Sequence, residues 1–120
     1  MEYSVSMKKN HEFRRVYAKG NNVATATLAV YCSRARRNYN LLGFTVSTKV
    51  GNAVKRNKVR RRLREIYRLN EHKLVGGLDI VIVARVKSRY VDYWHLERDF
   101  LLACAKLGIL AEAAESSANQ

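Results

Sequence analysis

The sequence contains no proline, six glycines and only two cysteines among its 120 residues. Without abundant proline or glycine, collagen-like and low-complexity chains are excluded. Two cysteines are also too few for the framework of a small disulfide-rich domain. Because Cys32 and Cys104 both stand in apolar surroundings, we expect reduced, buried thiols rather than a disulfide, as in a cytoplasmic protein.

Long apolar stretches are missing as well. No run approaches the roughly 18 apolar residues of a membrane-spanning helix, and residues 1–10 are polar where a secretory signal would be apolar. We therefore expect a cytoplasmic protein with no membrane partner. With 48% hydrophobic residues, the chain predicts a single domain over residues 1–110. A tail rich in alanine, serine and glutamate follows over residues 111–120 and is expected to be disordered.

Acidic residues are scarce relative to basic ones: 10 Asp and Glu stand against 23 Lys and Arg, which gives a net charge of +13. The basic residues concentrate in segment 49–73, where only Glu65 and Glu71 are acidic. The basic residues of this segment are Lys49, Lys55, Arg56, Lys58, Arg60, Arg61, Arg62, Arg64, Arg68 and Lys73. Such a concentration is typical of a surface that binds phosphate groups, so nucleic acid is the favoured partner.

The spacing of apolar residues predicts helices packed on a small sheet, which is an α+β fold. Along the chain we expect a helix over 10–20, strands over 22–33 and 41–48, a helix over 53–73, a strand over 78–86 and a helix over 92–108. One of the strand segments has room for two strands. Asn10, Asn52 and Asp92 are the expected N-caps of the helices, and Gly20 and Gly108 follow two of the helix ends.

The helix expected over 53–73 is amphipathic, because at about 100° per residue an apolar stripe lies opposite a polar row. The stripe contains Val59, Leu63, Ile66 and Asn70, and the row contains Asn57, Arg61, Arg64 and Arg68. A solvated helix face usually mixes charges of both signs, whereas the consecutive arginines at 60–62 repel one another. We interpret the row as a binding surface, since a guanidinium donates to two phosphate oxygens at once.

Residues 51–65 read Gly-Asn-Ala-Val-Lys-Arg-Asn-Lys-Val-Arg-Arg-Arg-Leu-Arg-Glu. This run resembles the signature of the bacterial ribonuclease P protein component, a family with an Arg-Asn-Arg motif. Lys58 departs from the motif at its third position, where it keeps the charge and loses the bidentate fork. The segments similar to the family's flanking elements are 10–20, 29–31, 43–49 and 80–85, so the resemblance covers about residues 8–108.

The resemblance implies a fold like the second domain of ribosomal protein S5. That fold is a small, mainly antiparallel sheet of four strands packed with helices, in the order αβββαβα. The resemblance also implies a left-handed βαβ crossover through the basic helix, although right-handed crossovers are the general rule.

The resemblance further implies two RNA-binding surfaces. The basic helix would face the catalytic RNA near its metal ions through Arg56, Asn57, Lys58, Arg60, Arg61, Arg64 and Arg68. A cleft between the first helix and the sheet would hold the single-stranded 5′ leader of precursor tRNA with Phe13, Tyr17, Tyr31 and Lys49. Aromatic faces beside basic side chains stack unpaired bases, which favours this cleft independently. By pattern alone, Phe13 and Tyr17 also fit the core stripe of a short helix.

No catalytic constellation is visible in the sequence. The carboxylates are scattered, and His11, His72 and His95 fall in different elements, so neither a metal cluster nor an acid–base pair is indicated. We therefore expect no catalytic residue and no organic cofactor. By resemblance, the RNA subunit of the endonuclease performs the cleavage and Mg²⁺ serves the assembled enzyme. Asn57 would contact a metal ion at most through water.

The expected partners are ribonuclease P RNA and the precursor tRNA leader, without a protein partner. The protein would raise the affinity for substrate and metal by neutralising phosphates. Two other functions stay open on the residues alone. A structural RNA-packaging protein needs no aromatic cleft. A DNA-binding regulator needs a helix-turn-helix partner before residue 52, where the sequence predicts a strand.

Overall fold

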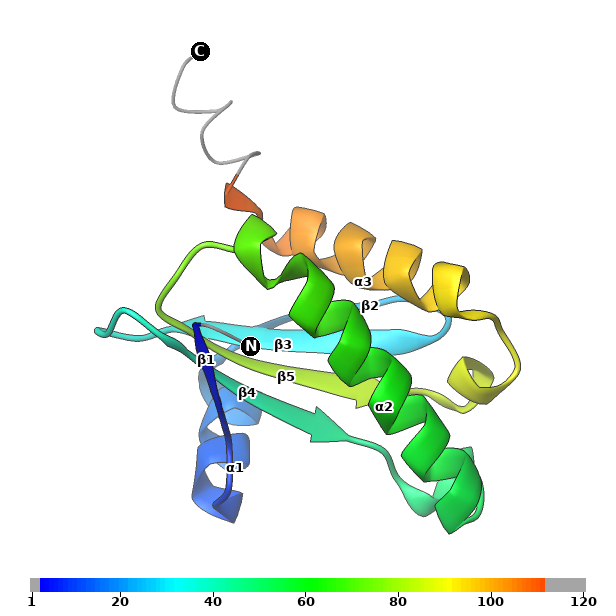
Figure 1. Ribbon diagram of the computed structural model, residues 1–120. Coiled ribbons are helices and arrows are strands. Elements are labelled where there is room, and N and C mark those ends of the chain that lie inside the picture. The colour runs from blue at the N-terminus through cyan, green and yellow to red at the C-terminus, as the bar shows by residue number, and fades with distance from the viewer. Residues whose placement is uncertain (1–2, 112–120) are drawn as a thin grey trace.

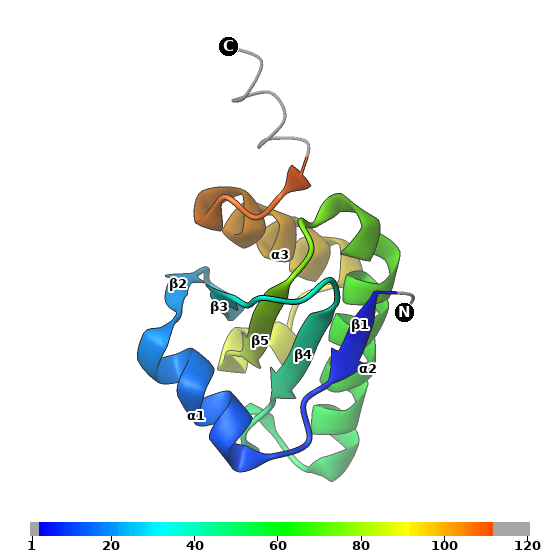
Figure 2. The same cartoon turned by 90° about the vertical axis from the view of Figure 1, so that its left-hand side faces the viewer.

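Helices cover both faces of one sheet in the computed structural model, which describes residues 3–111 (Figure 1). The strands are β1 (Ser4–Ser6), β2 (Asn21–Ala24), β3 (Leu28–Arg34), β4 (Asn40–Thr45) and β5 (Leu78–Ala84). The helices are α1 (Asn10–Lys19), α2 (Ala53–Asn70) and α3 (Tyr93–Leu107), with short 3-10 helices η1 (Thr48–Val50), η2 (Glu71–Lys73) and η3 (Val86–Arg89). α1 lies on one face of the sheet, and α2 and α3 lie on the other (Figure 2).

The predicted tail over residues 111–120 lies outside the described residues from position 112 onward. Within residues 3–111, none of the helices is long and apolar enough to cross a membrane.

The strands lie in the order β1-β4-β5-β3-β2. β3 pairs antiparallel with β2 and β5, whereas β4 pairs parallel with β5 and β1. The α+β class is confirmed. The sheet differs from the expectation in two respects, because it has five strands instead of four and contains as many parallel as antiparallel pairings. The additional strand is β1, whose three residues are too few for alternation to be recognised.

The connection from β4 through α2 to β5 is left-handed, as the resemblance implied (Figure 1). Because β4 and β5 are parallel neighbours, the hand of this crossover decides which face of the sheet receives α2. A right-handed path would have placed α2 on the face that α1 covers. The left-handed path places it beside α3, and the two helices share one core with the sheet.

The larger core lies between the sheet and the helices α2 and α3. It includes Leu28, Val30 and Cys32 of β3, Val59, Leu63 and Ile66 of α2, and Leu96, Phe100 and Cys104 of α3. Both cysteines are free and buried, as predicted. Burial raises the pKa of the Cys104 thiol to about 12, so this thiol stays protonated and unreactive at neutral pH. A smaller cluster of Met7, Val16 and Val81 lies under α1 on the other face.

Most helix ends follow the local sequence signals. Asn52 and Asp92 are N-caps, as predicted, and their side-chain oxygens accept hydrogen bonds of 3.0 and 2.8 Å from the backbone N–H three residues later. α1 is the exception, because its N-cap is Lys9 and not Asn10. The carboxylate of Glu12 accepts a hydrogen bond of 3.0 Å from the Lys9 backbone N–H, which starts the helix one residue earlier than expected.

The segment expected as a strand over 22–33 contains two strands joined by a turn. β2 ends at Ala24 and β3 begins at Leu28, and the two pair as a hairpin. The apolar alternation continues through the turn, and no glycine, proline or asparagine marks it. Thr25 closes the turn instead, because its hydroxyl donates to the Leu28 carbonyl at 3.0 Å and accepts from the Leu28 N–H at 3.2 Å.

A buried polar network attaches β1 and α2 to the sheet. The fully buried Tyr67 places its hydroxyl 2.6 Å from Ser4 Oγ, and it accepts a hydrogen bond of 3.2 Å from Asn40 Nδ2. Asn40 Oδ1 in turn accepts from the backbone N–H of Leu78 at 2.9 Å. Ser4 Oγ also donates to the carboxylate of Glu71. One asparagine side chain thereby connects the beginnings of β4 and β5 with the end of α2.

We predict that Asn40→Ala destabilises the protein by roughly 2–4 kcal/mol, because it leaves a buried N–H unpaired and removes a partner of the Tyr67 hydroxyl. Urea unfolding measures this free energy. Asn38 is exposed, so Asn38→Ala serves as the matched control and should cost less than about 0.5 kcal/mol. Equal stability of the two variants would contradict the assigned role of the network.

Candidate nucleic-acid interface

One flank of α2 carries a hollow that is lined by basic side chains. Its lining residues are Val54, Asn57, Arg60, Arg61 and Arg64. The buried stripe of α2 holds the helix on the sheet, so helical periodicity turns these residues outward. The structure therefore brings together four of the predicted site residues, and none of the residues that line this hollow is acidic. An electropositive, acid-free hollow of this kind favours phosphate groups.

The side chains of the hollow are differently constrained. Arg60 Nη1 donates a hydrogen bond of 3.0 Å to Asn57 Oδ1. The Arg64 guanidinium lies 5.9 Å from the ring centroid of Phe44, a residue near the end of β4. Within residues 3–111, Arg61 has no hydrogen-bond or ion-pair partner. Arg64 likewise has none within these residues, so Arg61 and Arg64 are the arginines of the hollow whose donors are available to a ligand.

Two of the predicted arginines are engaged elsewhere. Arg56 Nη1 donates to the Gly51 carbonyl at 3.1 Å and so braces the first turn of α2. Arg68 donates to both carboxylate oxygens of Glu65, at 3.0 and 2.6 Å. This hydrogen bonding lowers the pKa of the Glu65 carboxyl and keeps the pair ionised. The charge of Arg68 is offset by its partner, so the predicted row effectively ends at Arg64.

Lys58 lies on the other flank of α2. Together with Lys55, Val59, Arg62, Arg89 and Tyr90 it lines a second hollow. The departure from the family motif therefore does not lie in the arginine hollow. Sequence reasoning missed Arg89 and Tyr90, because no periodicity connects η3 with α2. The available signal was the pair of basic residues in the short segment after β5.

Aromatic side chains gather on the face of the sheet that α1 covers. The rings of Tyr17 and Tyr31 meet edge to face, with centroids 4.9 Å apart. The Tyr17 hydroxyl lies 2.7 Å from Thr45 Oγ1, and 38% of the Tyr17 residue surface is exposed. Two aromatic residues predicted for the cleft are thus in contact, with Tyr17 exposed and Tyr31 half-buried. Their edge-to-face arrangement leaves aromatic surface for a stacked base.

Phe13 and Lys49 have different positions from the tyrosine pair. Phe13 is half-buried and packs over Gly43, where an added Cβ would lie 2.5 Å from the ring. Gly43 is therefore required for the close approach of Phe13 to β4. Lys49 is exposed in η1, and within residues 3–111 no hydrogen bond, ion pair or cation–π contact joins it to the aromatic residues. The structure brings the three aromatic residues together on one face and leaves Lys49 as a free cation beyond the end of β4.

A family model for ribonuclease P matches residues 1–108. The chain belongs to the ribonuclease P protein family. The resemblance carried by residues 51–65 is thereby confirmed.

Curated relatives and solved structures agree with this assignment. The ribonuclease P protein component of Natranaerobius thermophilus is 39% identical over 110 residues, which cover 92% of this chain and 96% of that protein. The component of Alkaliphilus metalliredigens is 40% identical and is matched over its whole length. The RNase P protein of Staphylococcus aureus superposes with a TM-score of 0.81 at 29% identity, over 88% of this chain and 96% of that one. The Thermotoga maritima protein gives 0.74 at 29% identity, over 81% and 92%.

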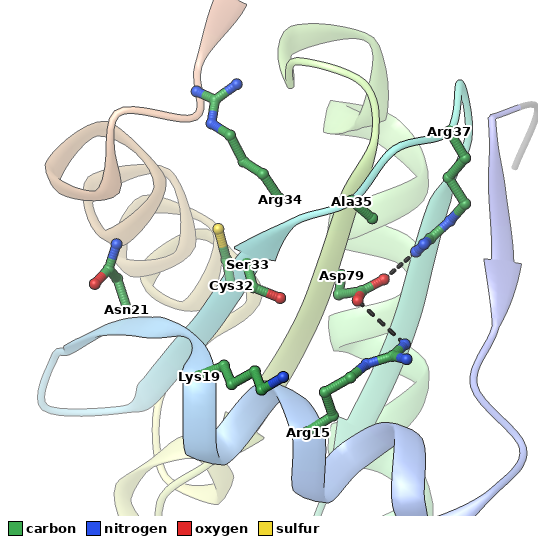
Figure 3. A pocket seen from close by; sticks show the side chains of 9 residues that line it. All are labelled: Arg15, Lys19, Asn21, Cys32, Ser33, Arg34, Ala35, Arg37 and Asp79. Atoms are coloured by element: carbon green, nitrogen blue, oxygen red, sulfur yellow. Dashed lines mark hydrogen bonds and ion pairs between the residues drawn. The ribbon is translucent and has the colours of Figure 1, made fainter.

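This ribonuclease P protein carries a further basic hollow that the sequence did not indicate (Figure 3). Its centre is the buried carboxylate of Asp79, which forms ion pairs with Arg37 and, at 3.4 Å, with Arg15. Lys19 and Arg34 line the same hollow. Arg15 and Lys19 lie on the flank of α1 turned away from Phe13 and Tyr17, because two residues correspond to about 200° of helix. Four cations and a single carboxylate line this hollow, which leaves a positive surplus on this side of α1.

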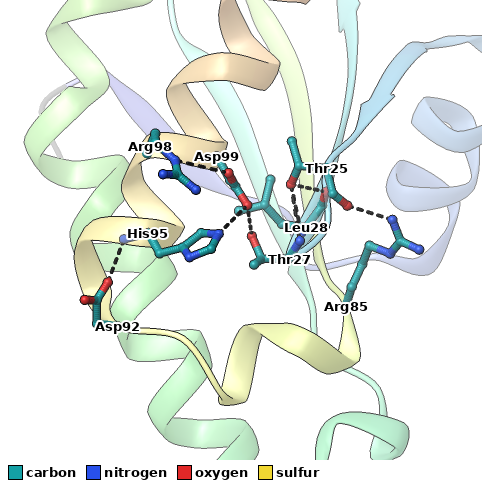
Figure 4. A network of polar contacts seen from close by, with 8 residues as sticks. All are labelled: Thr25, Thr27, Leu28, Arg85, Asp92, His95, Arg98 and Asp99. Atoms are coloured by element: carbon teal, nitrogen blue, oxygen red, sulfur yellow. Dashed lines mark hydrogen bonds and ion pairs between the residues drawn. The ribbon is translucent and has the colours of Figure 1, made fainter.

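The nearest approach to an acid–base pair in the described residues is His95 with Asp99 (Figure 4). His95 Nε2 lies 3.5 Å from the carboxylate of Asp99, and the same carboxylate accepts a hydrogen bond of 2.6 Å from Thr27 Oγ1. The Thr27 hydroxyl is buried and donates its proton to Asp99, so it is not placed as a nucleophile. The network joins the β2–β3 turn to α3. Within residues 3–111, no three His, Cys, Asp or Glu side chains form a group that would hold a metal ion.

We predict that Gly43→Ala destabilises the protein by roughly 1–3 kcal/mol, because the new methyl group collides with the Phe13 ring. This collision disappears when the ring is absent, and the contact that remains, 3.0 Å to Met7 Sδ, involves a flexible side chain. Gly43→Ala should therefore cost much less in a Phe13→Ala background, and urea unfolding of the four proteins of this double-mutant cycle measures the difference. Additive costs would show that the ring does not lie over Gly43.

Proposed function

We propose that this chain is the RNA-binding protein subunit of a cytoplasmic ribonuclease P, in which it assists the catalytic RNA in removing the 5′ leader from precursor tRNA. The observation that carries the proposal is the separation of two unlike surfaces. The arginine hollow lies on α2, and the tyrosine pair joins α1 to β3. Figure 2 shows α1 and α2 on opposite faces of the sheet. A protein built in this way can hold two RNA molecules at once without competition between them.

The arginine hollow fits a folded RNA. Arg60, Arg61 and Arg64 present planar donors that match phosphate oxygens. Contacts with phosphates do not depend on the base sequence of the RNA, as expected for a surface that binds the backbone of a structured RNA. Neutralising phosphates there reduces the repulsion between ribonuclease P RNA and its substrate, so less Mg²⁺ would be needed for the two to approach.

The aromatic face fits a single-stranded leader. Tyr17 is exposed and Tyr31 half-buried, so the pair offers ring surface for unpaired bases, and the exposed Lys49 in η1 is a free cation beyond the end of β4. Mature tRNA has no leader, so this face distinguishes precursor from product. Stacking on aromatic side chains is tolerant of sequence, which suits a subunit that must accept the leaders of many precursors.

The residues of the arginine hollow do not fit a protein-bound metal ion. Asn57 Oδ1 accepts a hydrogen bond from Arg60, and the positive charges of Arg61 and Arg64 line the same hollow. Cations of the assembled enzyme would therefore be held by RNA phosphates. We assign the hydrolysis to the RNA subunit, since His95 and Asp99 have no accessible nucleophile beside them.

Arg61→Ala combined with Arg64→Ala should weaken binding to ribonuclease P RNA and flatten its salt dependence. Losing two phosphate contacts reduces the slope of log K against log salt by about 1.5. Filter binding or fluorescence anisotropy over a range of salt concentrations measures the slope. Glu65→Gln combined with Arg68→Gln removes a paired charge of each sign and should leave the slope nearly unchanged. Equal slopes for wild type and the double-arginine variant would exclude this flank as the RNA interface.

At low Mg²⁺, the protein should strongly stimulate cleavage of precursor tRNA by a bacterial ribonuclease P RNA.

Tyr17→Ala combined with Tyr31→Ala should weaken precursor binding roughly 5- to 100-fold, which corresponds to about 1–3 kcal/mol of base stacking. Affinity for mature tRNA serves as the internal control and should not change. Tyr39 is exposed outside the cleft, so Tyr39→Ala is the control variant. An equal loss of affinity for precursor and mature tRNA would remove the leader from this face and favour a general RNA-packaging protein.

A further inference from the structure

Two aromatic side chains are strongly exposed on the molecule and belong neither to the arginine hollow nor to the tyrosine pair. Tyr90 and Trp94 expose 69% and 70% of their residue surface. Tyr90 follows η3, and Trp94 belongs to the first turn of α3. Exposed aromatic rings offer flat apolar surface that a stacking ligand can bury.

Fixed cations surround Tyr90. The Arg89 guanidinium lies 4.7 Å from the Tyr90 ring centroid, and its Nη1 also donates to the Val50 carbonyl at 3.1 Å. Lys58 and Arg62 of α2 line the same hollow as Tyr90, and none of its lining residues is acidic. The pairing of Arg89 with Tyr90 is thus held in place by the backbone of η1 and does not depend on a chance rotamer.

The neighbouring hollow extends this surface towards α3. Lys58, Arg61 and Arg62 line it together with Glu65, whose carboxylate is paired with Arg68, and with Tyr93, whose ring meets that of Trp94 edge to face at 5.1 Å. Arg62 Nη1 donates to the Val91 carbonyl at 3.1 Å, which ties the segment before α3 to α2. Arg61 also lines the arginine hollow. A ligand on the arginine hollow can therefore continue across α2 onto the aromatic residues.

We infer that Lys58, Arg62, Arg89, Tyr90 and Trp94 form a third RNA site, which binds an unpaired stretch of ribonuclease P RNA. The bases stack on Tyr90 and Trp94, and the adjoining phosphates contact Lys58, Arg62 and Arg89. This inference rests on the proposed function of the arginine hollow. It also explains Lys58, which stands where the family motif has arginine. Its ammonium group is a compact point charge that contacts one phosphate beside the aromatic rings.

An RNA strand fits this surface better than an apolar protein partner does. A protein covering Tyr90 and Trp94 would also desolvate the cations that surround them, which is costly without matching carboxylates. A single RNA strand supplies an aromatic base and a negative charge at every nucleotide. The continuity with the arginine hollow through Arg61 favours the same RNA molecule on both surfaces.

Trp94 is the only tryptophan of the chain, so its fluorescence reports on this surface alone. Titration of the full-length protein with a bacterial ribonuclease P RNA should quench Trp94. Tyr90→Ala should lower the affinity for this RNA roughly 5- to 100-fold while leaving the salt slope unchanged, because a stacking ring is lost and no charge is removed. Tyr90→Phe keeps the ring and should restore the affinity, and Tyr39→Ala, at an exposed tyrosine elsewhere, should have no effect.

The outcomes separate this site from the proposed function. If wild type binds the RNA with a steep salt dependence, while Tyr90→Ala binds equally well and Trp94 is not quenched, the third site is wrong and the arginine hollow stands. If wild type does not bind the RNA, the proposed function fails and the third site fails with it. Vesicles of phosphatidylglycerol and phosphatidylcholine test whether this surface binds an anionic membrane instead of RNA. A blue shift of Trp94 with vesicles and no response to RNA would identify a membrane-binding surface and overturn the proposal.

Discussion

The burial of one apolar stripe of α2 is the constraint on which the rest of the structure depends. Val59, Leu63 and Ile66 are almost completely removed from water, so the helix cannot rotate and its basic residues cannot turn away from solvent. Each fully buried aliphatic side chain contributes about 1.5–3 kcal/mol, whereas repulsion between neighbouring like charges on a helix costs only a few tenths. Apolar burial therefore outweighs the repulsion between the basic side chains and keeps them close together on one helix. Bound phosphate groups would lower this repulsion.

The hand of the crossover determines how the RNA-binding surfaces are arranged. With α2 and α3 on one face, the stripe of α2 joins the larger core and only a small cluster remains under α1. The sparse packing on that second face leaves Tyr17 exposed and Tyr31 only half-buried. A right-handed crossover would have brought α2 onto the same face and covered the tyrosines. The unusual hand is thus directly connected with the separation of the two proposed RNA-binding surfaces.

Tertiary contacts divide the basic residues of α2 into groups that sequence reasoning had treated as one row. Arg60, Arg61 and Arg64 share a hollow, while Lys58 lies on the other flank beside residues that follow β5. Arg68 is neutralised by Glu65 one turn away. Residue type and helical spacing predicted the outward face of α2 correctly. They did not predict the partners, because ion pairs and loop contacts depend on which side chains the fold brings beside the helix.

The sequence by itself determined the local elements: the caps at Asn52 and Asp92, the amphipathic α2, and the family to which the chain belongs. These features depend on residues a few positions apart, so periodicity and capping chemistry are sufficient. Only the tertiary structure decided that β1 is anchored through Ser4 and Tyr67, and that Lys58 lines one hollow with Arg89 and Tyr90. Those contacts join residues that are 31 or more positions apart, and no local pattern encodes the free energy of bringing such residues together.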